Sequence, residues 1–254
     1  MTPPGTLWLV PAPLDLGAAE MPLDTVLPQA VLARAAALQH WVVEDAKSAR
    51  ALLKRVAQHL PLALPLQALH MAELPRPPKG GARGTAPAVD WAALLAPALQ
   101  GHDLGLLSEA GLPAVADPGS ALVAAAHAAG VPVQPLAGPS SLMLALAASG
   151  LNGQSFAFVG YLPQEAEART ARIRELEAGS RRQGQTQLAI ETPYRNAALL
   201  QALVQVLQPT TRLAVSVGLT LEGGCTRSAP VAAWRQQPLA LPDRLPAVFA
   251  WLAG

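Results

Sequence analysis

A segment over residues 105–150 most constrains the fold of this 254-residue chain, because it alternates short apolar runs with glycine–proline turns. Leu104–Leu107 is an apolar run that stops at polar residues, as a buried parallel strand does. Breaker residues at 111–119 precede a predicted helix over 120–129, and a second strand is predicted over 131–136. Ligands of open parallel sheets bind at the carboxyl ends of such strands. This segment therefore predicts an α/β fold with a ligand site.

The rest of the chain shows the same alternation of strands and helices. Further strands are predicted over 6–10, 41–43, 156–162, 187–190, 212–217 and 246–252, with helices over 25–38, 48–60, 90–99, 163–177 and 196–207. Residues 61–69 are predicted to form either another strand or an extended segment. Residues 218–227 are predicted to form a loop. The character of the sequence changes after residue 150, which predicts two α/β domains, 1–150 and 151–254, with a ligand cleft between them.

Composition excludes several classes of protein. Hydrophobic residues make up 51% of the chain and charged residues 14%, which is typical of a globular protein. Aromatic residues are scarce at 4%, and the net charge of +1 predicts no global attraction for nucleic acid. A single cysteine, Cys225, excludes an internal disulfide, and the five histidines lack metal-ligand spacing, so no metal is expected. No signal peptide or membrane span is apparent, which predicts a soluble cytoplasmic protein.

Familiar nucleotide and hydrolase motifs are missing. No Gly-x-Gly-x-x-Gly follows the first strand, and no Gly-Lys-Ser/Thr ends a loop. The chain also lacks the Gly-x-Ser-x-Gly elbow of acyl-transfer enzymes. A dinucleotide fingerprint, a P-loop and a serine-hydrolase elbow are therefore excluded.

Six short motifs occur in a definite order along the chain. They are Val10–Pro13, Glu44–Lys47, Ser108–Pro113, Asp117–Gly119, Gly138–Ser141 and Glu191–Arg195. In this order they resemble the tetrapyrrole-methylase-like (class III) S-adenosylmethionine methyltransferases. Within that group the chain is most similar to the ribosomal RNA small subunit methyltransferase I family, which methylates the 2′-oxygen of a 16S rRNA cytidine. The resemblance implies two α/β domains of the tetrapyrrole methylase type, S-adenosylmethionine in the cleft between them, and a homodimer.

The resemblance also implies roles for individual residues. The implied cofactor-binding residues are Pro11, Ala12, Pro13, Ser108, Glu109, Ala110, Gly111, Leu112, Asp117, Gly138, Pro139, Ser140, Ser141, Thr192 and Pro193. Glu191, Arg195 and Asp45 are the candidates for catalysis, because a ribose hydroxyl needs a base to remove its proton. Three of these residues have a structural alternative as well. Glu191 and Arg195 could simply pair with each other, and Asp117 could cap the helix that follows it.

Departures from the family pattern leave the identity of the methyl acceptor open. Glu109 stands where the family usually has aspartate, and Leu112 replaces a threonine. The charged motifs of the C-terminal domain become Val217–Leu221 and Leu241–Pro246. A methyltransferase of rRNA or of the small ribosomal subunit is the leading hypothesis. A paralogue that methylates a small molecule such as a tetrapyrrole, and a non-catalytic cofactor- or RNA-binding protein, are the alternatives.

One further segment bears on the substrate. Residues 75–88 are rich in proline, glycine and basic side chains, which predicts either a surface loop or an arm that grips a polyanion through Arg76, Lys79 and Arg83.

Overall fold

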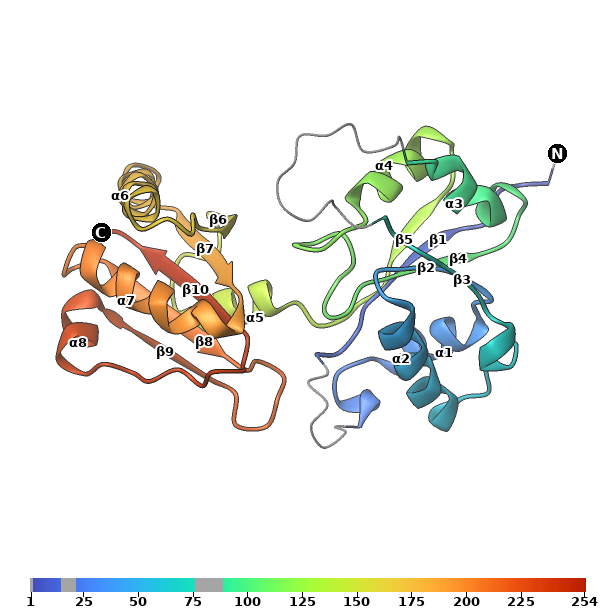
Figure 1. Cartoon of the computed structure of the whole chain (residues 1–254), viewed down its shortest axis with the longest axis horizontal. Helices are drawn as coiled ribbons and strands as arrows, with labels where there is room; N and C mark the ends of the chain where they lie inside the picture. The colour runs from blue at the N-terminus through green and yellow to red at the C-terminus, as the bar shows by residue number, and fades with distance from the viewer. Residues whose placement is uncertain (1, 15–21, 76–88) are drawn as a thin grey trace. The chain divides into compact units, whose positions relative to one another are not determined.

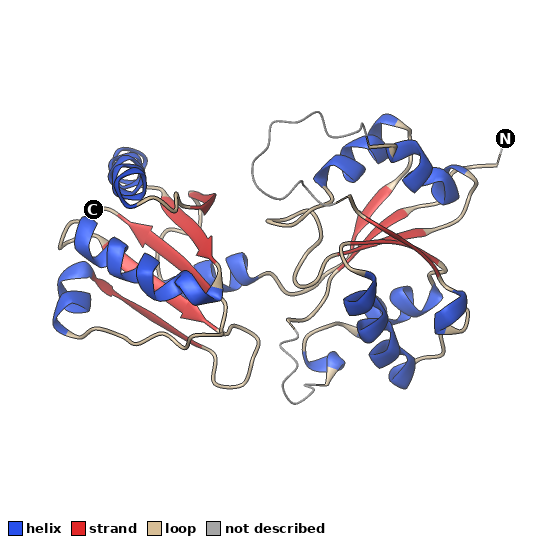
Figure 2. Cartoon of the chain, in the orientation of Figure 1, coloured by secondary structure: helices blue, strands red, loops and turns tan. Residues whose placement is uncertain are grey.

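The structure, a computed structural model, describes residues 2–14, 22–75 and 89–254. The chain divides into two compact units, Met1–Pro139 and Ser140–Gly254 (Figure 1). Each unit contains one five-stranded sheet with helices packed against it, so the predicted α/β class is confirmed (Figure 2). The arm predicted over residues 75–88 lies almost wholly outside the described residues, and Arg76, Lys79 and Arg83 are among those not described.

The sheet of the first unit is parallel throughout, in the order β3-β2-β4-β1-β5. Its strands are β1 (Leu7–Val10), β2 (His40–Val43), β3 (His70–Glu73), β4 (Leu104–Leu107) and β5 (Val133–Pro135). Every residue of the central strand β4 is buried, which explains its continuous apolar run. Because all five strands point the same way, their carboxyl ends share one edge of the sheet.

Helices cover both faces of this sheet. One face carries α1 (Gln29–Ala37), α2 (Ala46–His59) and the short 3-10 turns Leu23–Thr25 and Leu66–Ala68, and the other carries α3 (Trp91–Leu99) and α4 (Ser120–Ala128). α2 packs through Ala49, Leu53 and Val56, which follow helical spacing.

Of the two alternatives for residues 61–69, the strand is wrong. Pro61 and Pro65 lack the N–H groups that a sheet ladder requires, so this segment forms an irregular turn and the strand begins only at His70.

Glycine at position 105 allows α1, the adjoining strand β2 and β4 to pack closely. A Cβ at this position would lie 2.6 Å from Cε3 of Trp41, one of the largest fully buried side chains. The strand interior would otherwise favour a branched residue, since glycine weakens strands. Here the indole of Trp41 takes the space that such a side chain would fill.

The sheet of the second unit is mixed, in the order β6-β7-β10-β8-β9. Its strands are β6 (Phe156–Tyr161), β7 (Thr186–Glu191), β8 (Arg212–Val217), β9 (Cys225–Pro230) and β10 (Ala247–Leu252), and β6 and β7 form its one parallel pair in the part of the chain described. The loop predicted over 218–227 ends early, because β9 begins at Cys225 and pairs with β8.

Four helices complete the second unit. They are α5 (Ser141–Ser149), α6 (Ala166–Gln183), α7 (Asn196–Val206) and α8 (Val231–Gln236), with a 3-10 turn at Pro193–Arg195. Leu142 and Leu146 of α5 pack with Leu188, Ala214 and Val248 of the second sheet. We expected this helix to close the first domain at residue 150. Its apolar face instead joins the second core, so the second unit begins at Ser140.

Candidate functional site

Loops from the carboxyl ends of β1, β4 and β5 meet at one place in the first unit. Ala12 N–H donates to the carbonyl of Gly111 at 3.0 Å, and Gly111 N–H donates back to the carbonyl of Ala12 at 2.8 Å. Gly138 lies directly against the ring of Pro11, since a Cβ at position 138 would be 2.3 Å from Pro11 Cβ and Cγ. Residues about a hundred or more positions apart in the sequence therefore form one backbone framework.

A pocket of about 450 Å³ opens beside this framework. The size falls within the roughly 300–1,000 Å³ of small-molecule sites. Its lining from the strand ends consists of Ala12, Pro13, Leu107, Ser108 and Glu109, and its lining from α2 and the residue before it consists of Asp45, Lys47, Ser48, Ala51, Leu52 and Arg55. Five of the predicted site residues, together with buried apolar atoms, thus line a cavity of suitable size.

A second feature of the site is the unusual backbone that follows β4. Ala114 and Ala116 both have φ of 65°, a left-handed conformation that alanine rarely adopts, and Gly111 and Gly119 are also left-handed. Such conformations are costly and gather where the surrounding structure imposes them for function. The strained backbone therefore indicates that this loop positions its backbone groups and carboxylates, and that it does more than connect β4 to α4.

Carboxylates concentrate around Asp117 in this loop. The side chain of Asp117 is half-buried and is hydrogen-bonded to Ser108. Burial, and then the nearby charges of Glu44 and Glu109, raise the pKa of Asp117 to about 6. Glu44 is held in place because its Oε2 accepts the N–H of Glu109 at 3.1 Å. The cluster can thus attract a cation and can hold a proton near neutral pH.

The helix-cap alternative for Asp117 is wrong. α4 begins at Ser120, and the residue at its N-cap position is Gly119 with φ of 127°. The carboxylate of Asp117 is turned toward Ser108 instead.

Asp45, by contrast, is a helix cap. Its Oδ1 accepts the N–H groups of Lys47 at 3.0 Å and Ser48 at 2.8 Å, and also the hydroxyl of Ser48 at 2.8 Å. The neighbouring Ala46 N–H donates to Glu73 Oε1 at 2.9 Å. Asp45 lines the pocket, but the oxygen that caps α2 already accepts three hydrogen bonds, which makes it a poor proton acceptor.

Six of the predicted residues lie in the second unit, namely Ser140, Ser141, Glu191, Thr192, Pro193 and Arg195. Ser140 occupies the N-cap position of α5, and no side-chain hydrogen bond caps this helix in the described structure; Ser141 is the first residue of α5. Glu191 is buried at the end of β7 and accepts the Thr192 N–H at 2.7 Å, the Thr192 hydroxyl at 3.2 Å and a short hydrogen bond from Arg195. This pattern stabilises the turn that contains Pro193.

Several pocket residues were not predicted from the sequence. All five come from α2 and none was singled out as a site residue: Lys47 belongs to the motif Glu44–Lys47, and Ser48, Ala51, Leu52 and Arg55 lie in the helix predicted over 48–60. The available signal was the run of basic residues in this helix, which contains no acidic residue to balance them.

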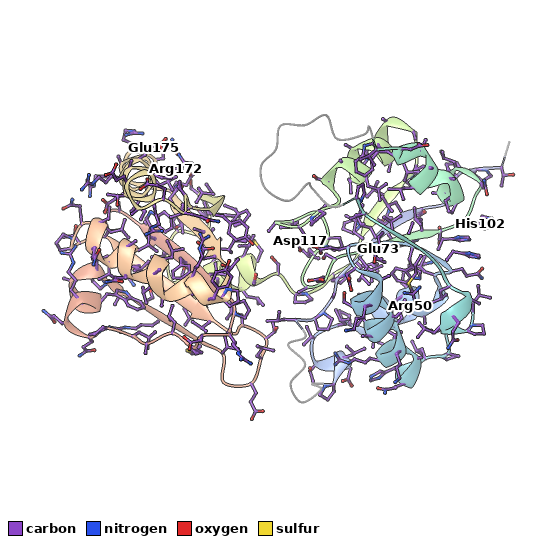
Figure 3. All side chains as sticks on the ribbon, viewed as in Figure 1. Arg50, Glu73, His102, Asp117, Arg172 and Glu175 are labelled. Atoms are coloured by element: carbon purple, nitrogen blue, oxygen red, sulfur yellow. The ribbon has the colours of Figure 1, made fainter. Side chains whose placement is uncertain are left out.

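The amino-terminal edge of the same sheet carries a different cluster. The rings of His40 and His70 stack with centroids 4.8 Å apart, and the ring of His102 lies 5.1 Å from that of His40. Burial, followed by the two neighbouring histidines, lowers the pKa of His40. Figure 3 shows His102 and Asp117 at opposite ends of the unit. Among the described residues, no three histidine, cysteine or acidic side chains are placed to hold a metal ion.

The fold and pocket define a two-unit α/β protein with a pocket of small-molecule size at the strand ends of a parallel sheet, built without a dinucleotide fingerprint. The family model of tetrapyrrole (corrin/porphyrin) methylases matches residues 20–231. The chain therefore belongs to the tetrapyrrole methylase family, and the resemblance seen in its motifs is confirmed. Within the described residues, no helix is long and apolar enough to cross a membrane.

Two curated relatives of the same name match this chain over different lengths. The chain is 30% identical to the ribosomal RNA small subunit methyltransferase I of Pseudomonas aeruginosa over 228 residues, which cover 90% of this chain and 71% of the relative. It is 37% identical to the protein of the same name from Vibrio cholerae over 134 residues, covering 53% of this chain and 45% of the relative. The chain thus spans about half the length of several curated relatives that it matches.

Solved structures support the fold. The uroporphyrin-III-C-methyltransferase of Thermus thermophilus aligns over 98% of this chain and 92% of its own, with a TM-score of 0.50 and 21% identity. A conserved hypothetical protein of Aeropyrum pernix K1 aligns over 98% and 85%, with a TM-score of 0.60 and 18% identity. At these identities the likeness establishes the architecture alone.

The raised pKa of Asp117 predicts a pH-dependent stability. The folded state holds this proton up to about pH 6, whereas the ordinary pKa of an aspartate in an unfolded chain is 3.8. The contribution of this carboxyl group to the free energy of unfolding is therefore fully favourable below about pH 4 and is lost as pH rises through 6. Asp117→Asn removes the group, so the variant should gain stability over the native protein more at pH 7.5 than at pH 5. We expect a difference on the order of 1 kcal/mol, because water screens a half-buried carboxyl.

Thermal unfolding at the two pH values measures this difference. Asp243→Asn, which removes an exposed carboxylate from a loop of the second unit, is the matched control. An equal effect of Asp117→Asn at both pH values would contradict the prediction.

Proposed function

We propose that this protein is an S-adenosylmethionine-dependent methyltransferase that methylates the 2′-oxygen of a cytidine in 16S rRNA. The observation that carries the proposal is the match to the Pseudomonas aeruginosa relative, which runs through nearly the whole chain and both of its units. Family membership supports the reaction class, and the name of the relatives supports the substrate. The structure adds a pocket at the position where such a ligand is expected.

The residues of the first unit fit the methyl donor chemically. S-adenosylmethionine combines an adenosine with a sulfonium cation and an amino acid. Ala12, Leu52 and Leu107 offer apolar surface to a flat ring, and Ser108 offers a hydrogen-bonding hydroxyl. The carboxylates around Asp117 would favour the positive charges of the donor. The cofactor-binding roles predicted for the loops at 11–13, 108–112 and 138–139 are retained in this proposal.

The reaction itself needs little from the protein beyond positioning and a proton acceptor. The donor supplies an electrophilic methyl group, so the protein has to hold the acceptor oxygen in line with it. The proton of the ribose hydroxyl leaves as the new carbon–oxygen bond forms. The pKa of Asp117 is raised to about 6, close to neutral, which suits a general base at physiological pH. Asp45 and Glu191 already accept several hydrogen bonds and are better suited to holding loops in place.

The first test is calorimetric titration with S-adenosylmethionine and with its demethylated product. Micromolar binding, weakened in a Ser140→Ala/Ser141→Ala variant, would support the donor site and the roles of both serines. Failure of the native protein to bind either ligand would overturn the proposal.

The acceptor is tested separately. Transfer of a labelled methyl group to unmodified small ribosomal subunits, located by nuclease digestion at a cytidine ribose, is the expected result. Transfer only to a tetrapyrrole would favour the small-molecule alternative, and donor binding without transfer to any cellular fraction would favour the non-catalytic alternative.

The proposal includes the assembly and location that the family supports. We expect a homodimer in the cytoplasm, and light scattering of the purified protein measures the mass directly.

A further inference from the structure

α2 is an unusually basic helix for a chain with a net charge of only +1. Its sequence, AKSARALLKRVAQH, contains Lys47, Arg50, Lys54 and Arg55 and no acidic residue. Exposed helices of soluble proteins normally intersperse both signs, which stabilises them through pairs one turn apart. α6 follows that rule, because its arginines alternate with glutamates and Arg172 bonds Glu175 at 2.6 Å (Figure 3). α2 lacks any such acidic neighbour within its own sequence.

The position of these charges works against the stability of the helix. Lys47 lies in the first turn of α2, where the positive end of the helix dipole disfavours a cation and favours an anion. The cap Asp45 and the neighbouring Glu73 accept backbone N–H groups at this end of the helix and supply the expected negative charge. A cation that lowers the stability of its own helix indicates a role other than folding.

The basic side chains face away from the core. Ala49, Leu53 and Val56 form the buried side of α2, and Lys47, Arg50 and Lys54 are exposed on the opposite side. The spacing of three and then four residues places these three cations in one row along the helix. At about 1.5 Å per residue the row is about 10 Å long, a length that spans two or three phosphates of a nucleic-acid strand.

The row leads directly into the candidate site. Lys47 lines the pocket together with Arg55 and Ser48 of the same helix. Arg50 and Lys54 continue the row along the outer surface of α2, and Figure 3 shows Arg50 on this helix. A strand that lay along the row would therefore enter the pocket at the end where Ser108 and Glu109 lie.

We infer that the exposed basic face of α2, formed by Lys47, Arg50 and Lys54, is the surface on which the phosphate backbone of the acceptor RNA docks. The inference rests on the proposed function and names the part of the protein that holds its substrate. Charge complementarity identifies the partner, because a row of cations on a helix that contains no acidic residue suits a polyanion. An anionic membrane does not fit the same face, since the apolar side that would insert into lipid is packed against the sheet.

The test compares two pairs of charge-removing substitutions in the full-length protein. Arg50→Gln/Lys54→Gln removes two cations of the row without altering a residue that lines the pocket. Arg174→Gln/Arg182→Gln removes two exposed cations of α6 in the second unit and serves as the matched control. Binding of fluorescently labelled 16S rRNA transcript is measured by anisotropy at several salt concentrations, and S-adenosylmethionine binding is measured by calorimetry on the same preparations.

We expect the α2 pair to weaken RNA binding about 10-fold at moderate salt. The slope of log affinity against log salt should become shallower by about 1.4, because each lost phosphate contact contributes about 0.7 on single-stranded RNA. The α6 pair should leave both quantities unchanged, and both variants should bind S-adenosylmethionine like the native protein.

Equal effects of the two pairs, or an unchanged salt slope in the α2 pair, would overturn the inference. Binding of phosphatidylserine vesicles that is lost in the α2 pair, with RNA binding retained, would overturn it in favour of a membrane. If the native protein does not bind RNA at all, the inference is overturned as well. If the native protein fails to bind S-adenosylmethionine, it is the proposed function that fails, so the two failures are distinguished.

Discussion

Replacing Gly138 with alanine is expected to weaken methyl-donor binding by about 10- to 100-fold while the protein still folds. The added Cβ would lie 2.3 Å from Cβ and Cγ of Pro11, a distance at which the two loops must separate. A proline ring cannot rotate out of the way, so the strain acts on the framework that holds Ala12 against Gly111. Overpacking of this kind costs about 1–3 kcal/mol, and each 1.4 kcal/mol is tenfold in affinity.

Calorimetry with S-adenosylmethionine measures the loss, and two further variants interpret it. Gly153→Ala adds the same methyl group where nothing lies within 4 Å, so it should bind the donor normally. Pro11→Gly in the Gly138→Ala protein removes the clashing ring and should restore part of the affinity through the coupling between the two positions. Normal donor binding by Gly138→Ala would show that this close approach does not shape the site.

Replacing Glu191 with alanine is expected to destabilise the second unit by about 3 kcal/mol. The Glu191 side chain is only 4% exposed, and it accepts hydrogen bonds from Thr192 and Arg195. Its removal leaves the guanidinium of Arg195, itself only 21% exposed, without its charge partner. The turn at Pro193–Arg195 would lose the contact that connects it to the end of β7.

Urea unfolding, together with hydrogen exchange over residues 186–206, measures this effect within the second unit. Arg172→Ala breaks the exposed pair with Glu175 on α6 and should cost less than about 1 kcal/mol, which gives the matched control. Glu191→Gln should retain part of the stability by keeping an oxygen for Thr192. Unchanged stability of Glu191→Ala with loss of methyl transfer would instead identify Glu191 as a catalytic residue.

Local sequence signals predicted most of the regular elements. The apolar run at Leu104–Leu107 marks a strand whose neighbours cover both faces, and the helix expected over 196–207 is found at Asn196–Val206. The errors occur where two preferences compete. Leu62, Leu64 and Leu66 occupy every second position, which is typical of a strand. Pro61 and Pro65 have no N–H group to donate to a neighbouring strand, so no ladder forms there.

The ends of elements depended on packing that no local signal reports. α5 follows directly on the loop of the first unit, and its alanine- and leucine-rich sequence fits either core. Its burial against Leu188 and Val248 assigns it to the second unit. Likewise, α4 begins at Ser120 as expected, but its N-cap position is held by Gly119, and Asp117 is hydrogen-bonded to Ser108 instead of capping the helix.

By itself the sequence determined the α/β class, the family and the three loops that carry the candidate site, because turn residues and apolar runs act over a few neighbouring positions. Only the tertiary structure decided what those loops do together. The backbone pairing of Ala12 with Gly111, the contact of Gly138 with Pro11 and the charge coupling of Asp117 to Glu44 join residues far apart in the chain. Such contacts arise when parallel strands bring their carboxyl ends to one edge of a sheet, which no local pattern encodes.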